Sequence, residues 1–359
     1  MKLLVLAQIP PPIHGQSVMV ELLVRELPGP GIDVLHVPLS LSRNQGDIGR
    51  WRAGKIFTAI SAGFAARKLA RQHPGAILYY VPAPGKAGAF WRDVLLMALV
   101  RPVTRKTVYH WHATGLTAWL QASAGPLARF AARRWLRSPD LSIVLSPALR
   151  ADADHLGSQT VAVIPNAVPQ PARPSEPSPS PTKSVLFLGQ CSASKGLFAT
   201  LEAVRSLRST GVDCTLTVAG AFADEEEHRE FARLCAANPD AVSYRGEVAG
   251  AVKEQLLQES SCLCFPTVYP HEGMPLVILE ALAHGLPVVA TRWRSIPDLV
   301  PPAAGILVEP ADAASLSTAL GAMLENPPAR SAVRQTFTDR FSIGSHLAAL
   351  RQALLSLGR

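Results

Sequence analysis

Two glutamates in the second half of the sequence lie where a carboxylate could serve a bound ligand. Glu272 follows an apolar strand expected over residues 262–266, and Glu280 lies in the apolar segment that Pro275 opens. Pro at a first helical position and Gly after the last are typical helix boundaries, so we expect a short helix over residues 274–284. The free N–H groups at its start would face the loop that carries Glu272 and could bind a phosphate.

The second of these carboxylates has two explanations. A charge on an otherwise apolar helix between two apolar strands is costly unless it has partners. Glu280 could be a satisfied core residue of a capped helix, or it could accept hydrogen bonds from sugar hydroxyl groups beside a bound phosphate. Gly273 would let the backbone approach such a ligand, because it has no side chain.

Two histidines alternate on an expected strand in the first half of the chain. His110 and His112 lie on or just after the strand over residues 107–111, so they share a face and reach its carboxyl end. Open α/β sheets bind ligands at that end. The pair could also ligate a metal, but no third ligand lies near in the sequence. A D-x-D pattern at Asp152 and Asp154 falls inside a helical pattern, so we exclude it as a metal motif.

Two further loops follow an apolar strand and precede a helix. The first carries His14 and Gly15, and the second carries Lys195 before Gly196. Both loops suit a phosphate, and the lysine suits a diphosphate, although a surface loop with solvated polar groups would have the same composition. Neither half has G-x-G-x-x-G after a strand, which disfavours a dinucleotide-dependent oxidoreductase.

Strand and helix patterns alternate through both halves of the chain. This alternation predicts parallel sheets covered by helices on both faces, an α/β fold. The expected strands cover residues 2–7, 33–38, 76–81, 107–111, 141–145, 161–164, 184–188, 214–219, 241–244, 262–266, 286–290 and 305–308. Residues 116–137 predict one basic amphipathic helix, which could lie on an anionic bilayer or pack on the core with its arginines in solvent.

Composition and charge limit the class of protein. The chain has 359 residues, 48% hydrophobic and 17% charged, as in folded globular enzymes. Its apolar runs are far shorter than the roughly 20 residues of a membrane span, and residues 1–12 predict a strand rather than a signal peptide. All five cysteines follow residue 190 and are expected to be reduced, which indicates the cytosol.

Positive charge is concentrated in the first half. Residues 1–168 have 19 Lys and Arg against 8 Asp and Glu, a net charge of +11, whereas residues 169–359 have 16 against 19, a net charge of −3. We therefore expect the first half to face an anionic partner, either phospholipid or a lipid diphosphate. Nucleic acid is a third candidate, but the sequence has no nucleic-acid recognition motif or zinc spacing.

The segment from Tyr269 to Ala290 resembles the E-x7-E motif of the family-4 retaining glycosyltransferases of the GT-B fold. It carries Glu-Gly-Met-Pro, then Glu-Ala, then Gly-Leu-Pro-Val-Val-Ala. The resemblance implies two Rossmann-like domains facing across a cleft. The expected parts are an acceptor-binding domain over 1–168, a Pro/Ser-rich linker over 169–183, a nucleotide-sugar-binding domain over 184–340 and a helix over 341–359 that crosses back to the first domain.

The resemblance also implies roles for individual residues. Glu272 would contact the donor sugar and Glu280 the ribose of the nucleotide. Lys195 matches a phosphate-binding lysine, whereas Gln190 stands where the family has an arginine, so Arg245 is a candidate to replace that charge. The remaining donor-binding residues implied by the resemblance are Gly15, Gly273, Met274, Pro275 and Leu276.

Three histidines have roles that the resemblance leaves open. The family has a histidine near the transferred sugar, and His112 is the better match to it, with His110 as the alternative. We therefore expect His112 and Glu272 to be the catalytic pair and His110 to contact the acceptor. His14 replaces a family glycine and could contact either the acceptor or the donor.

The implied activity is that of a retaining, metal-independent hexosyltransferase. It would move a sugar from a nucleotide-diphosphate sugar to a glycan or polyprenyl-diphosphate-linked acceptor in the assembly of bacterial surface polysaccharide or glycolipid. No cofactor or metal is expected, because basic groups and a helix start would neutralise the diphosphate. The alternatives are an epimerase or hydrolase on the same fold, and a non-catalytic nucleotide-sugar-binding partner of a membrane synthase. The expected location is the cytoplasm, with attachment to the inner face of the plasma membrane left open.

Overall fold

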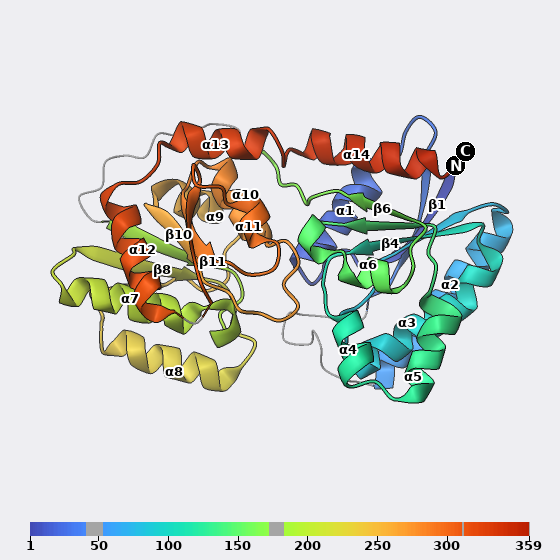
Figure 1. Ribbon diagram of the computed structural model, residues 1–359, viewed down its shortest axis with the longest axis horizontal. Helices are drawn as coiled ribbons and strands as arrows, with labels where there is room; N and C mark the ends of the chain where they lie inside the picture. Colours follow the sequence, from blue (N-terminus) through green and yellow to red (C-terminus); the bar gives the residue numbers. More distant parts are fainter. Residues whose placement is uncertain (41–52, 172–182, 311, 359) are drawn as a thin grey trace. The chain divides into compact units, whose positions relative to one another are not determined.

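The chain forms two compact α/β units in a computed structural model, which describes residues 1–40, 53–171, 183–310 and 312–358 (Figure 1). Unit 1 comprises Met1–Asn166, Pro270–Met274 and Gly344–Arg359, and unit 2 comprises Ala167–Tyr269 and Pro275–Ile343. Most of the linker expected over residues 169–183 falls at 172–182, outside the described residues.

Unit 1 is built on a six-stranded parallel sheet with the strand order β2-β1-β3-β4-β5-β6. Its strands are almost continuously apolar, as in KLLVLA, because helices bury both faces of a parallel sheet. The predicted strands are confirmed to within one residue at each end. They are β1 (Lys2–Ala7), β2 (Asp33–Pro38), β3 (Ile77–Tyr80), β4 (Lys106–Trp111), β5 (Leu141–Val144) and β6 (Thr160–Val163).

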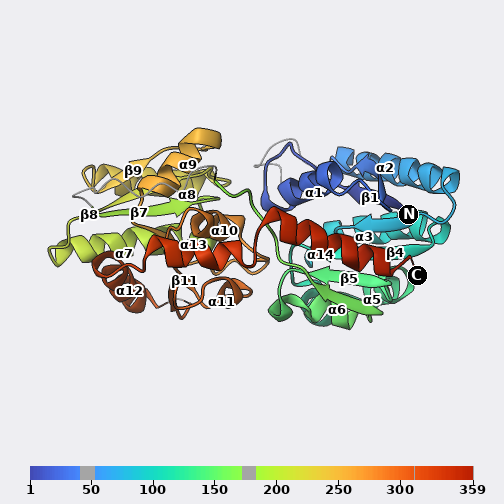
Figure 2. The same cartoon turned by 90° about the horizontal axis from the view of Figure 1, so that it is seen from above.

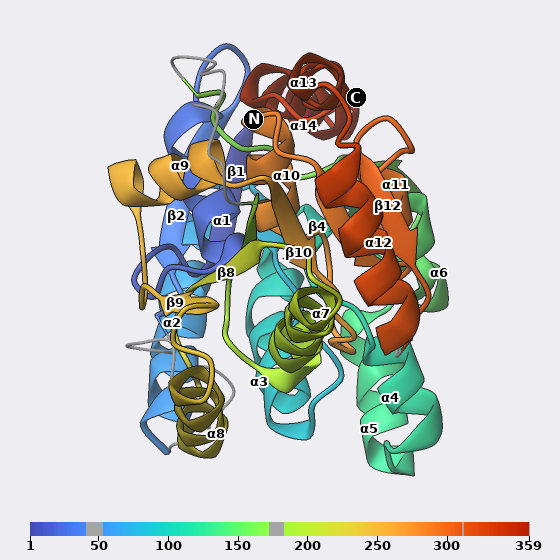
Figure 3. The same ribbon diagram turned by 90° about the vertical axis from the view of Figure 1, so that its left-hand side faces the viewer.

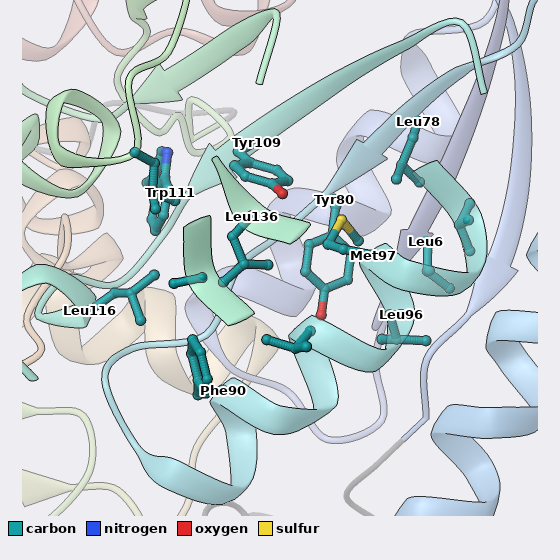
Figure 4. Close-up of a cluster of buried hydrophobic side chains, with 14 of the residues drawn as sticks. Leu6, Leu78, Tyr80, Phe90, Leu96, Met97, Tyr109, Trp111, Leu116 and Leu136 are labelled. Atoms are coloured by element: carbon teal, nitrogen blue, oxygen red, sulfur yellow. The ribbon is translucent and has the colours of Figure 1, made fainter. Parts of the chain in front are cut away.

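Helices cover the two faces of this sheet unequally. One face packs against α1 and against α14, which lies across the sheet in Figure 2. The other face packs against a thicker helical layer, whose core includes Leu6, Tyr80, Phe90, Tyr109 and Trp111 (Figure 4). The helices are α1 (Gly15–Glu26), α2 (Ala53–Gln72), α3 (Ala87–Val100), η2 (Arg101–Val103), α4 (Leu116–Ala122), α5 (Pro126–Ala131), η3 (Ala132–Leu136), η4 (Pro147–Leu149), α6 (Ala151–His155) and α14 (Ile343–Ser356).

The single helix expected over residues 116–137 is wrong. The helix α4 ends at Ala122, and the backbone of Gly125 is extended, with φ −72° and ψ 170°. Pro126 then starts α5, because proline suits a first helical position and its ring would clash inside a continuous helix. The last turns form the π-helical segment η3, so the basic stretch consists of three short segments.

Unit 2 repeats the architecture with the strand order β12-β11-β10-β7-β8-β9. The strands are β7 (Lys183–Leu188), β8 (Cys214–Ala219), β9 (Val242–Tyr244), β10 (Cys262–Phe265), β11 (Val288–Thr291) and β12 (Gly305–Val308). The helices are η5 (Ala193–Lys195), α7 (Leu197–Ser209), α8 (Glu225–Ala236), α9 (Gly250–Glu259), α10 (Leu276–Ala283), α11 (Ile296–Leu299), α12 (Ala313–Glu325) and α13 (Arg330–Thr338). The sequence did not predict α9.

The helix expected over residues 274–284 is shorter than predicted. Pro275 is its N-cap, with an extended ψ of 119°, and the helix begins at Leu276. It ends at Ala283, and the next strand starts at Val288 rather than at Leu286. The two units also divide this segment, because Met274 belongs to unit 1 and Pro275 to unit 2.

Candidate active site

The carboxyl end of β4 brings the two predicted histidines together. The imidazole rings of His110 and His112 lie 4.1 Å apart between centroids. The hydroxyl group of Tyr79, on the neighbouring strand β3, is hydrogen-bonded to Nδ1 of His110. The shared face that the alternation predicted is therefore confirmed, and Tyr79 fixes the orientation of the first ring.

Burial keeps these histidines uncharged. Burial, together with the smaller effects of the nearby His346 and His14, lowers the pKa of His112 to about 3. The pKa of His110 is also lowered, first by burial and then by His112 and His346. At neutral pH the imidazoles can therefore accept or donate a hydrogen bond, but they carry no positive charge.

His346 belongs to this cluster although it lies far along the sequence, on α14. Its Nδ1 is 2.6 Å from the backbone oxygen of Pro165. Burial lowers its pKa, and the bond to Pro165 partly opposes that effect. We did not predict this residue, and the only signal for it was that the family resemblance returns the last helix to the first domain.

His14 has a structural role at the start of α1. It is the N-cap of this helix, and its Nδ1 accepts a hydrogen bond of 3.3 Å from the backbone N–H of Ser17. The Ser17 hydroxyl in turn accepts from the His14 backbone N–H at 3.0 Å, and Gly15 is the first residue of the helix. Burial lowers the pKa of His14.

The loop before Met274 packs against the end of β4 within unit 1. A side-chain carbon at Gly273 would lie only 2.0 Å from the backbone oxygen of His112, so only glycine fits there. Nδ1 of His271 is 2.8 Å from the backbone oxygen of Thr114. The amide of Asn166 donates to the backbone oxygen of Met274 at 3.1 Å. These contacts fix the backbone on both sides of Glu272, whose side chain is buried.

Buried polar atoms without a partner gather in the same place. Among the described residues, Nε2 of His110, Nε2 of His112, Oγ1 of Thr114 and Oδ1 of Asn166 are buried and have no hydrogen-bond partner. Leaving a buried polar group unsatisfied costs about 1–3 kcal/mol, and such groups usually mark a place that a ligand or water fills. The cluster thus offers hydrogen bonds to a polar ligand.

In unit 2, the loop between β7 and α7 positions Lys195. Ser192 caps the short η5 by accepting from the Lys195 N–H, and Gly196 follows in the left-handed region, with φ +88°. A side-chain carbon at Gly196 would lie 2.5 Å from the backbone oxygen of Pro266. The Lys195 amino group lies 4.6 Å from the ring centroid of Tyr269, a cation–π contact.

Glu280 is held by an ion pair that we did not predict. Its Oε1 lies 2.7 Å from Nζ of Lys253, on α9, and the two side chains are 18% and 31% exposed. On either side of Glu280, α10 is buried through Ile278, Leu279 and Leu282. The carboxylate therefore lies at the rim of the core, with one charged partner and partial access to solvent.

The other predicted residues lie as follows. Gln190 and Arg245 are exposed. Gln190 lies two residues beyond the end of β7, and Arg245 immediately follows β9. Met274, Pro275 and Leu276 span the start of α10, and the first two are buried. Asp152 accepts hydrogen bonds from the N–H groups of Gly115, Leu116 and Thr117, which caps the first turn of α4 and agrees with its exclusion as a metal ligand.

Two features are absent from the described residues. No three His, Cys, Asp or Glu side chains are grouped so that they could bind a metal ion. None of the described helices is both long and apolar enough to cross a bilayer.

Comparison with known proteins gives matches in both sequence and structure. Residues 182–326 match the family model "Glycosyl transferases group 1". The chain is 30% identical over 246 residues to a phosphatidyl-myo-inositol mannosyltransferase of Mycobacterium leprae, covering 61% of this chain and 64% of that protein. It is 28% identical over 222 residues to the putative colanic acid biosynthesis glycosyltransferase WcaL of Escherichia coli, covering 58% and 52%. The chain thus spans less than two thirds of the length of these curated relatives.

Solved structures share the two-unit fold. The sucrose-phosphate synthase of Thermosynechococcus elongatus superposes with a TM-score of 0.77 at 18% identity, covering 99% of both chains. The Anabaena protein Alr3699/HepE, in a complex with UDP, gives a TM-score of 0.70 at 17% identity, covering 99% of this chain and 100% of that one. The α/β fold of this chain is therefore the two-domain fold of GT-B glycosyltransferases.

Proposed function

Because residues 182–326 match the glycosyl transferases of group 1, we propose that this chain transfers a hexosyl group from a nucleotide-diphosphate sugar to a glycan or lipid-linked glycan. The transfer would retain the anomeric configuration and serve polysaccharide or glycolipid biosynthesis. The observation that carries the proposal is the match over residues 182–326, which includes Lys195, Glu272 and Glu280. The relatives described as acting on phosphatidylinositol and in colanic acid biosynthesis support this class of acceptor.

In this proposal the donor binds mainly to unit 2. Lys195 and the free N–H groups at the start of α10 neutralise the diphosphate, which stabilises the leaving group without a metal ion. Glu280 accepts hydrogen bonds from the ribose hydroxyl groups, and Arg245 supplies the charge absent at Gln190. The UDP and UDP-glucose complexes of the Anabaena protein support a nucleotide-sugar donor.

In this proposal, residues at the end of β4 in unit 1 bind the transferred sugar. His112 and Glu272 would contact the sugar at the reacting carbon, and His110 and His14 would contact the acceptor. The unpartnered Nε2 atoms of His110 and His112 support this assignment, because sugar hydroxyl groups can donate to them. The basic charge of the first half supports a polyprenyl-diphosphate acceptor and a place at the cytoplasmic membrane surface.

A donor screen followed by a product assay tests the proposal. The purified chain is screened by thermal shift against UDP, GDP, ADP, CMP and dTDP sugars, because a bound ligand raises the melting temperature. Release of nucleotide from the best donor is then measured with and without a polyprenyl-diphosphate glycan, and the product anomer is read by NMR. Turnover only with acceptor, with retention, is expected. Equal turnover without acceptor would instead show a hydrolase or epimerase, and binding without turnover a non-catalytic partner.

A further inference from the structure

The helical layer on one face of the unit 1 sheet has almost no acidic residue to balance its positive charge. Residues 48–139 contain 15 Lys and Arg and a single carboxylate, that of Asp93. Asp93 is buried and already paired, 2.6 Å from Arg92 and 2.7 Å from the hydroxyl group of Tyr80. The surface formed by this part of the chain therefore has no carboxylate of its own to neutralise its cations.

The same layer exposes large apolar side chains. Phe57 and Phe64, two turns apart on one side of α2, are 73% and 57% exposed. Leu127 and Phe130, one turn apart on α5, are 69% and 65% exposed. Within the described parts of the chain, the three most exposed large hydrophobic side chains are all in this group. None of these four side chains belongs to the buried core residues of α2 and α5.

Basic side chains lie on the same outward sides as these apolar side chains. On α2, Lys68 and Arg71 follow Phe64 on the outward side, and both are exposed. Arg133, Arg134 and Arg137 follow α5 and are also exposed. For the described residues, no ion pair joins any of these five side chains to a carboxylate.

These helices form one continuous layer. The helix α2 packs against α3, and α3 packs against η3, the continuation of α5. Their inward sides share one core with the sheet, and Figure 3 shows α2, α3 and α5 along the same side of the sheet. The exposed phenylalanines and the cations therefore belong to the outer surface of one side of unit 1, here called the α2–α5 face.

We propose that the α2–α5 face docks on the surface of an anionic lipid bilayer. Phe57, Phe64, Leu127 and Phe130 enter the boundary between head groups and acyl chains, and the surrounding lysines and arginines bind lipid phosphates. Charge complementarity selects this partner, since the face is cationic throughout. Exposed phenylalanines among those cations favour lipid over duplex DNA, whose bases are already stacked and whose phosphates need only the cations. The proposal does not depend on the chemistry of the donor site.

Vesicle sedimentation of the full chain tests the docking. Vesicles of phosphatidylcholine with about one third phosphatidylglycerol should sediment the protein at low salt and release it at about 0.5 M salt, where charges are screened within a few ångströms. Phosphatidylcholine alone should bind at least about tenfold more weakly. The pairs Phe57→Ser/Phe64→Ser and Leu127→Ser/Phe130→Ser should each weaken binding about fivefold or more, and Arg133→Glu/Arg134→Glu about tenfold or more.

Two control variants isolate the face. Val163→Ser removes an apolar side chain of β6 that is 45% exposed, and Arg229→Glu changes a charge on α8 of unit 2. Both should bind as the wild type does. The docking proposal is wrong if the wild-type protein does not bind anionic vesicles. It is also wrong if the serine variants bind these vesicles as the wild type does and duplex DNA displaces the vesicles from the protein. Donor affinity and melting temperature are measured on every variant, so a failure of docking is distinguished from a failure of the transferase proposal.

Discussion

The residues assigned to the reaction lie in two regions that are stabilised by different means. At the end of β4 in unit 1, the side chains of His110 and His112 are uncharged, and the backbone of Gly273 packs directly on that of His112. On α10 in unit 2, Glu280 is ionically paired with Lys253 and remains partly open to solvent.

This difference predicts how substitutions in each region affect stability and activity. Close backbone packing and buried neutral rings leave no space for a change of shape, so substitutions in unit 1 should affect both stability and transfer. A partly exposed ion pair contributes only about 0–1 kcal/mol to stability. Substitutions in unit 2 should therefore reduce donor affinity while leaving the fold unchanged.

Gly273→Ala should have the largest effect. The added carbon would lie 2.0 Å from the backbone oxygen of His112, so the loop or the strand end must move. We expect a loss of about 1–3 kcal/mol in the free energy of unfolding. Transfer should fall about 100-fold, because a misplacement of about 1 Å at a reacting group has that effect. Urea unfolding and initial rates of transfer measure the two quantities.

Gly344→Ala is the matched control. Nothing lies within 4 Å of a side-chain carbon at Gly344, which is in α14 of the same unit. Alanine favours a helix over glycine by up to about 1 kcal/mol, so this variant should be as stable as the wild type or more so. A Gly273→Ala protein that unfolds and turns over like the Gly344→Ala protein would contradict the packing argument.

Glu280→Gln should reduce donor affinity by about tenfold or more at unchanged stability. A hydrogen bond to a charged group contributes roughly 1.5–3 kcal/mol, and the amide keeps the shape of the side chain. Calorimetric titration with the donor measures the loss. If Lys253 acts only by orienting this carboxylate, Lys253→Gln should weaken the donor less, and the double variant should bind like Glu280→Gln.

The exposed pair of Glu230 and Arg233 on α8 provides the control, with an N–O distance of 2.8 Å. Glu230→Gln removes the same charge from unit 2 and should leave donor affinity unchanged. If Glu230→Gln and Glu280→Gln weaken the donor equally, then the effect is one of net charge, and the assignment of Glu280 to ribose is wrong.

Lys195→Ala should lower affinity for a nucleoside diphosphate about five- to tenfold and affinity for the monophosphate much less. The lysine is proposed to contact the diphosphate, so its effect should depend on the second phosphate. Lys195→Arg retains the charge and should recover part of the affinity. Arg205→Ala, in an exposed ion pair on the outer side of α7, should change neither. If Lys195→Ala lowers the affinities for the diphosphate and the monophosphate equally, then Lys195 contacts another part of the donor.

The sequence predicts the fold well because its determinants are local. Continuous apolar strands such as KLLVLA and VVAT, separated by helices, specify parallel sheets without knowledge of distant contacts. The single helix over 116–137 was wrong because amphipathic periodicity continues across Gly125 and Pro126, although the backbone is broken there. Pro275 was placed inside α10, whereas it caps the helix from outside.

Site residues that depend on distant partners could not be predicted in this way. His346 reaches the cluster only because α14 returns to unit 1, 181 residues beyond Pro165. Lys253 lies on a helix that the pattern did not reveal, 27 residues before Glu280. Spacing identified the two glutamates and the β4 histidines. It contained no information about which side chains pair with them.

The pH dependence of stability tests whether the β4 histidines are neutral. Burial lowers the pKa of His112 to about 3, from an ordinary value near 6.5, and also lowers those of His110, His14 and His346. Between these values the unfolded chain binds a proton that the folded chain does not. Stability should therefore be constant above about pH 7 and fall as the pH drops below 6.5, and His112 alone should contribute about 1.4 kcal/mol per pH unit to that fall.

His112→Gln should reduce the pH dependence of the free energy of unfolding by the contribution of one histidine. Urea unfolding at pH 7, 6 and 5 compares the variant with the wild type, in a range where most carboxylates remain ionised. The variant is expected to be less stable at pH 7, because a packed ring is lost, yet to lose less stability on acidification. Equal slopes would mean that His112 is already charged or solvated in the folded chain. His112 would then be charged or open to solvent, as Glu280 is, and the contrast between the two regions would disappear.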